Sequence, residues 1–148
     1  MPSPVPVWLT EGAVVRLAEE WFAALDRRAP VDELLPLLVP SGLVLHFPEG
    51  VYREREGFRV WYEAAHRRLG TGAHAVTAID VRLNDGPSAE VGLTVDWQGS
   101  RRDALGRRRR TAHETRQIWT VAQQGGNTPQ IRTCSVTGLT AMLHTLAR

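Results

Sequence analysis

Three histidines of this 148-residue chain stand at the ends of apolar runs that predict β-strands. His46 ends a short run, His74 opens a longer one, and His113 begins a third. Histidine suits proton transfer because its ordinary pKa lies near neutrality. Tyr52 follows the first run, and a phenol beside a basic imidazole can donate a hydrogen bond to a developing oxyanion. These four residues are the predicted catalytic set.

A second group of residues, mostly aromatic, is predicted to bind the ligand. Large aromatic side chains at the mouth of a cavity favour flat, apolar molecules. The competing interpretation is that the tryptophans pack in the core and that each histidine is a hydrogen-bonded core or rim residue. The predicted ligand-binding residues are Trp21, Phe47, Trp61, Tyr62, Trp97, Gln117, Trp119 and Arg109.

The bulk composition is that of a soluble globular protein, with 43% hydrophobic and 23% charged residues. Arginine supplies every basic side chain, which suggests a GC-rich bacterial genome. Cys134 is the single cysteine, so we expect a small buried hydrophobe in a reducing cytoplasm. The start of the chain does not resemble a signal peptide, and the most apolar run, residues 34–47, is too short for a membrane span.

The first half of the sequence predicts helices. After an extended lead-in over residues 1–9, Thr10 is a plausible N-cap, and residues 10–148 form one domain. A helix stopped by Pro30 carries an apolar face at helical spacing, and Asp32 begins a short second helix that is ended by Pro40. The apolar positions of the first helix are Val14, Leu17, Ala18, Trp21 and Leu25.

A third helix is predicted from Glu54 to Leu69, after a short strand and a turn over residues 43–50. The hydrophobic period then changes from helical to two, which is typical of strands. Four strands joined by turns follow, and residues 139–147 form a possible terminal helix. The predicted strands are 74–83, 89–98, 111–121 and 130–137.

The element order predicts an α+β fold, in which an antiparallel sheet curls around three N-terminal helices and leaves a cavity at one end. On the third long strand, His113, Gln117 and Trp119 share one face. Histidine spacing shows no HxxxH or HxH pair, and the sequence carries no phosphate loop or G-x-S-x-G motif. We therefore expect neither a metal nor a cofactor.

Four segments of the sequence carry a resemblance to a known family: AEEWFAALDRRAPVDELLPLL (18–38), LVLHFPEGVYREREGFRVWYEA (43–64), HAVTAIDV (74–81) and ETRQIWTV (114–121). They resemble the nuclear transport factor 2-like superfamily in its SnoaL-like branch. The resemblance covers residues 10–139 and implies a cone-shaped, cystatin-like fold with a pocket at its wide end, often forming a homodimer through the sheet. The family hosts both enzymes and binding proteins, so it does not fix the function.

Three chemistries of the family fit these residues unequally. Ketosteroid isomerases have a basic Asp at the position that matches Phe47 of this chain, and a Tyr at the position that matches Trp21. The chain therefore lacks both groups. The Asp–Arg–Asp set of limonene-type epoxide hydrolases would need Asp80 or Asp96 inside the cone, where alternation does not place them. Scytalone-type dehydratases use histidines with tyrosines, which this chain does offer. A dehydratase, isomerase or polyketide cyclase acting on a small apolar metabolite is one hypothesis, and a non-catalytic binding or interaction module is the other.

The segment RRDALGRRRR, residues 101–110, carries six arginines and one aspartate. We interpret Asp103 to Gly106 as a turn between strands, with the arginines on strand ends. Outside this segment the chain is slightly acidic, which argues against a nucleic-acid docking face. The main interpretation of this segment is a solvated hairpin tip. The alternative is that Arg107 and Arg109, which alternate with His113, lie further out on the same side and hold an anionic group at the pocket mouth.

Overall fold

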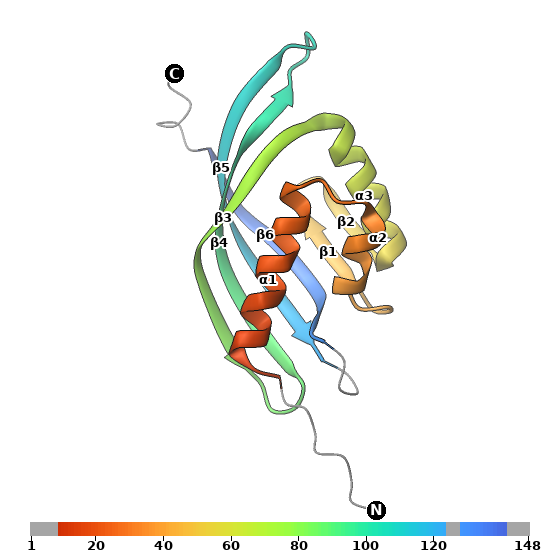
Figure 1. Cartoon of the computed structure of the whole chain (residues 1–148), viewed down its shortest axis with the longest axis vertical. Helices are drawn as coiled ribbons and strands as arrows, with labels where there is room; N and C mark the ends of the chain where they lie inside the picture. The colour runs from red at the N-terminus through yellow and green to blue at the C-terminus, as the bar shows by residue number, and fades with distance from the viewer. Residues whose placement is uncertain (1–8, 124–127, 142–148) are drawn as a thin grey trace, which may run out of the picture.

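A computed structural model of the chain describes residues 9–123 and 128–141. Its three helices lie on one side of a curved six-stranded sheet (Figure 1). The element order is α1 (Glu11–Asp26), α2 (Val31–Leu34), the 3-10 turn η1 (Leu35–Leu37), β1 (Val44–Phe47), β2 (Gly50–Arg53), α3 (Glu54–Arg68), β3 (Leu69–Leu83), β4 (Ser88–Arg102), β5 (Arg108–Ala122) and β6 (Gln130–Ala141). None of the helices described is long and apolar enough to cross a membrane.

Helix α1 begins where the sequence predicts, because the Thr10 hydroxyl accepts a hydrogen bond from the Ala13 N–H at 3.1 Å. The helix ends earlier than Pro30. A Schellman arrangement closes it, with Ala29 N–H bonded to the Ala24 carbonyl and Arg28 N–H to that of Leu25. Arg28 holds the left-handed position of this motif, with φ of 54°. Asp26 therefore becomes the last residue of α1.

The sheet is mixed rather than purely antiparallel, with strand order β2-β1-β6-β5-β4-β3. Strand β1 pairs in parallel with β6, so that Leu45 lies opposite Cys134. The predicted sheet omitted β2, whose four residues follow the Pro48–Gly50 turn and pair with β1. Four residues with one half-buried side chain give almost no alternation from which to predict a strand.

The long strands extend beyond their predicted limits because backbone pairing does not need apolar side chains. Strands β4 and β5 stay in register as far as the pair Arg102–Arg108. The predicted turn is confirmed, with the Gly106 N–H bonded to the Asp103 carbonyl at 3.0 Å. This hairpin projects beyond the helices at the top of Figure 1. Strand β6 continues to Ala141, so no helix begins at residue 139, and the rest of the predicted terminal helix lies outside the described residues.

The core lies between α1, α3 and the concave face of the sheet. Along β4 the buried residues Val91, Leu93 and Val95 alternate with outward polar residues, as predicted. A bulge between Val76 and Ala78 shifts the alternation of β3, which lets both His74 and Ile79 face inward on the same strand. Beyond the end of α1 the core gives way to a cavity.

Candidate active site

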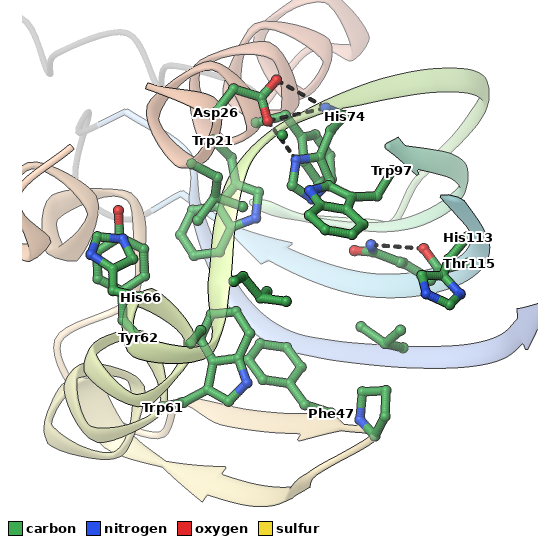
Figure 2. A pocket seen from close by; sticks show the side chains of 18 of the residues that line it. Trp21, Asp26, Phe47, Trp61, Tyr62, His66, His74, Trp97, His113 and Thr115 are labelled. Atoms are coloured by element: carbon green, nitrogen blue, oxygen red, sulfur yellow. Dashed lines mark hydrogen bonds and ion pairs between the residues drawn. The ribbon is translucent and has the colours of Figure 1, made fainter. Parts of the chain in front are cut away.

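The cavity lies between the concave face of the sheet and the helices α1 and α3, and encloses about 530 Å³. That volume is within the range of small-molecule sites. Apolar and aromatic side chains make up most of its wall, while a few titratable groups converge on it (Figure 2). The aromatic wall consists of Trp21, Phe22, Phe47, Trp61, Tyr62 and Trp97.

Two of the titratable groups, Asp26 and His74, are in direct contact. The Nδ1 atom of His74 lies 2.6 Å from Oδ1 of Asp26, and the backbone N–H of His74 donates to both carboxylate oxygens at 3.0 Å. Both side chains are mostly buried, with 20% and 27% of their surface exposed for His74 and Asp26. A carboxylate can only accept, so Nδ1 carries the proton and Nε2 is the basic nitrogen.

The position of β3 at the edge of the sheet explains this contact. An edge strand leaves alternate backbone N–H groups without a partner strand. At His74 the last residue of α1 supplies the missing acceptor, because Asp26 lies against that edge. One carboxylate therefore fixes both the backbone and the ring of the same histidine. A carboxylate that accepts a hydrogen bond from one ring nitrogen sets the tautomer and orientation of a catalytic imidazole.

His74, Trp97 and His113 form a row across three strands. His74 is paired with Trp97 and Trp97 with His113 in the sheet register. The indole of Trp97 is nearly parallel to the His113 ring, with centroids 6.3 Å apart and planes 13° apart. His113 also lies 2.7 Å from the Thr111 hydroxyl through Nε2. The row places two imidazoles on either side of a flat indole.

Two glycines allow the indole of Trp97 to lie close to the sheet. Gly72 and Gly99 are paired across β3 and β4 beneath it. A Cβ atom on Gly72 would approach the indole Nε1 to 2.7 Å, and one on Gly99 would approach Cζ2 to 2.5 Å. Real Cβ atoms do not come this close, so any larger residue would displace the ring. The glycine pair thus fixes where the aromatic face stands.

A hydrogen-bonded chain closes the floor of the cavity on β5. The Trp119 indole N–H donates to Gln117 Oε1 at 3.0 Å, and Gln117 Nε2 donates to the Thr115 hydroxyl at 3.3 Å. The thiol of Cys134 is 3.7 Å from the same Gln117 oxygen. Burial raises the pKa of Cys134 to about 12. The cysteine is a protonated, buried side chain, in agreement with the sequence prediction.

The wall formed by α3 carries a different polar group. The Tyr62 hydroxyl donates to the Ala29 carbonyl at 2.6 Å, and its pKa is raised by burial. His66 packs on the Tyr62 ring with centroids 4.0 Å apart. Burial, and then the charge of Arg28, lower the pKa of His66, so this imidazole is neutral at pH 7. Its Nε2 atom is buried with no hydrogen-bond partner among the described residues.

The structure brings most of the predicted site residues to the cavity. Of the predicted catalytic set, His74 and His113 line it, while His46 is exposed and Tyr52 packs against Phe47 outside the lining. His46 points away because strand alternation turns Leu45 and Phe47 toward the interior. The predicted ligand-binding residues that reach the wall are Trp21, Phe47, Trp61, Tyr62, Trp97 and Gln117.

Two predicted ligand-binding residues lie elsewhere. Trp119 is fully buried beneath Gln117 and does not reach the cavity. Arg109 is exposed on the β4–β5 hairpin, where its Nε donates to Asp103 Oδ2 at 3.0 Å. Arg109 is not among the described residues that line the cavity.

The sequence analysis missed Asp26, Arg28 and His66. Helical spacing held a signal for two of them, since Asp26 is four residues after Phe22 and His66 four residues after Tyr62. Residues at this spacing share a helix face, and both aromatic partners line the cavity. Arg28 carried no such signal, because its position depends on the early end of α1.

Within residues 9–123 and 128–141, no group of three His, Cys, Asp or Glu side chains is placed to hold a metal ion. The titratable groups of the cavity instead lie in pairs or singly. The arrangement suits transfer of a proton between a bound molecule and an imidazole, in a cavity whose wall is largely apolar and aromatic.

No family model matches the sequence, and no curated protein is similar to it. Solved structures share its fold at low identity. A candidate scytalone dehydratase from Novosphingobium aromaticivorans is 16% identical, with a TM-score of 0.75 over 87% of this chain and 85% of that one. The hexachlorocyclohexane dehydrochlorinase LinA-type3 from Novosphingobium barchaimii is 12% identical, with a TM-score of 0.74 over 88% of each chain.

A nuclear transport factor 2-like superfamily protein from Salmonella enterica is also similar, with 14% identity and a TM-score of 0.73 over 86% of this chain and 89% of that one. These likenesses establish the architecture. The chain has the nuclear transport factor 2-like, or cystatin-like, fold that the sequence predicts. Its assignment to the SnoaL-like branch stays a prediction.

Proposed function

We propose that this protein with the nuclear transport factor 2-like fold is an acid–base enzyme that removes a proton from carbon in a small, cyclic, largely apolar metabolite. The contact between Asp26 and His74 is the observation that carries the proposal. His74 is the general base through Nε2, and Asp26 holds the ring and stabilises the imidazolium that forms. The outcome is an elimination, such as dehydration, or an isomerisation.

The row of His74, Trp97 and His113 also supplies the acid that such a reaction needs. Loss of a proton from carbon leaves negative charge that must be transferred to a leaving group or a carbonyl oxygen. His113, held by Thr111 on the far side of Trp97, is the proposed acid for that group. The aromatic wall orients the ring of the substrate, and no step requires a cofactor in this proposal.

The names of two structural neighbours agree with this chemistry. One is described as a candidate scytalone dehydratase and another as a dehydrochlorinase, and both names denote eliminations. Low identity means that these names support the reaction class and do not identify a substrate. The polar groups of this cavity are the primary argument.

Solvent exchange can test the proposal before the natural substrate is known. In D2O, we expect the wild-type protein to accelerate exchange of the acidic C–H protons of 2-tetralone, a bicyclic ketone, as measured by NMR. The His74→Gln variant should lose this acceleration, and His46→Gln should keep it because His46 lies outside the cavity. Equal rates for wild type and His74→Gln across a series of cyclic ketones would overturn the assignment of the base.

A non-catalytic ligand-binding role is the second candidate, and the nature of Trp21 and Phe47 favours it. Both positions are apolar and line the cavity, although isomerases that resemble this chain carry a phenol and a carboxylate there. Under this alternative, cyclic ketones bind to wild type and to His74→Gln with equal affinity and neither protein accelerates exchange. Ligand-observed NMR on the same samples separates the two outcomes.

A further inference from the structure

Arg28 is a half-buried arginine on the cavity wall, and part of its guanidinium is not used by the protein. A guanidinium has five N–H donors. Two on Nη1 bond the carbonyls of Leu69 and Gly70 at 2.9 and 3.1 Å, and one on Nη2 bonds that of His66 at 2.9 Å. In the part of the chain that the structure describes, this leaves the Nε–H and the second Nη2–H.

The backbone at Arg28 indicates that its side chain does more than fill space. The residue holds φ of 54° in the Schellman motif, a conformation in which glycine is preferred and other residues are strained. Capping the end of α3 offsets part of that strain, because a cation is stabilised at a helix C-terminus. Capping, however, uses three donors and leaves the remaining two directed elsewhere.

The charge of Arg28 also lacks a carboxylate partner. No Asp or Glu of the described residues lies within ion-pair distance of it, whereas the neighbouring Arg27 is paired with Glu33. Asp26 is close in sequence, but its oxygens are occupied by the backbone and ring of His74. His66 accepts from Arg28 only through its backbone carbonyl, and its imidazole cannot supply a negative charge.

We infer that Arg28 binds a carboxylate of the ligand, so that the proposed substrate is a cyclic, largely apolar acid. The inference rests on the proposed function for its reaction and adds the class of substrate. Free donors on Nε and Nη2 suit a planar carboxylate, with which arginine makes charge-assisted hydrogen bonds. Binding there leaves the apolar ring against the aromatic wall and the row of His74, Trp97 and His113.

The test compares two probes of equal shape, 2-naphthoate and 2-naphthamide, by isothermal titration calorimetry. Wild type should bind the acid roughly 10- to 100-fold more tightly than the amide, the range expected for a charge-assisted pair. Arg28→Gln removes the charge but keeps a polar amide side chain, so the preference should vanish. Arg28→Lys should keep part of it, and Arg27→Gln, which alters an exposed neighbour, should keep all of it.

A second variant separates the effect of losing the charge from the effect of losing the fold. Arg28→Gly removes the same charge at a backbone position that favours glycine, and circular dichroism reports whether each variant is folded. Equal affinity of wild type for acid and amide would overturn the inference, as would a preference that survives in both Arg28→Gln and Arg28→Gly. Binding of 2-naphthoate involves no proton transfer, so a failure of the proposed catalysis in the D2O exchange test leaves this result standing.

Discussion

Asp26 binds His74 through both the backbone N–H and the imidazole of that residue. Such double attachment joins the end of α1 to the edge strand β3. It fixes the ring before any ligand arrives, which reduces the reorganisation that proton transfer requires. The same contact satisfies an edge N–H that the sheet leaves open, so one carboxylate meets a structural need and, under the proposed function, also orients the general base.

Replacing Asp26 by Asn should separate these two roles. The amide oxygen can still accept from the His74 backbone N–H, but the charge that stabilises an imidazolium is lost. We expect Asp26→Asn to remain folded and to slow C–H exchange of a responsive ketone by roughly 100- to 10,000-fold. NMR exchange rates and imidazole ¹⁵N shifts measure both effects. A variant with wild-type rates would show that the carboxylate has no part in the chemistry.

The position of the Trp97 ring depends on Gly99, and adding a single methyl group at Gly99 tests this. Gly99→Ala would place a Cβ atom 2.5 Å from the indole, so the ring must move. We expect a loss of about 1–3 kcal/mol in the free energy of unfolding and weaker binding of flat ligands. Gly92→Ala is the matched control, since it lies on the same strand with nothing within 4 Å of its added Cβ.

Urea unfolding and tryptophan fluorescence would report the two variants in parallel. Gly92→Ala should leave both the stability and the tryptophan emission of the protein close to wild type. If Gly99→Ala behaves in the same way, the indole has room to move and the glycine pair does not fix it.

The fold was predictable because its signals are periodic. Alternation along β4 and β5 assigned Val91, Trp97, His113 and Gln117 to the inner face, and the structure agrees. The same alternation says less on short strands, where the interior position of Leu45 and Phe47 places His46 outside. The parallel pairing of β1 with β6 joins segments about 90 residues apart, a contact that no local pattern encodes.

The central contact of the site was not predictable by the same means. Asp26 and His74 meet only because α1 ends at Asp26 and β3 lies at the edge of the sheet. Pro30 marked a later end of the helix, whereas Arg28 in a left-handed conformation closed it sooner. An arginine gives no local sign that it will adopt this conformation, because glycine is the residue expected there.

Protonation of His66 should weaken the fold at mildly acidic pH. Its pKa is lowered in the folded protein, first by burial and then by Arg28, so the unfolded chain binds the proton more readily. Stability is therefore retained above the ordinary histidine pKa of about 6.5 and falls as the pH drops through it. His66→Phe should lose less stability between pH 7.5 and pH 5.5 than wild type, measured by urea unfolding.

His46→Gln is the control for this experiment, since it removes an exposed histidine and should leave the pH dependence unchanged. Apart from His46 and His66, the titratable groups are common to all three proteins, so their contributions cancel in the comparison. Parallel pH profiles for wild type and His66→Phe would contradict the assigned shift.

An exposed side chain on the outer face of the sheet allows the predicted homodimer to be tested. Ile118 on β5 is 57% exposed, and its cross-strand neighbours are Gly92 and Ser135, so it stands above a surface of small residues. An exposed β-branched side chain of this kind can pack against a second sheet. If the sheet forms the dimer, Ile118→Glu should shift the mass in light scattering from dimer toward monomer. Val60→Glu, at a similarly exposed position on α3, should not. A wild-type protein that stays monomeric at high concentration would refute the prediction.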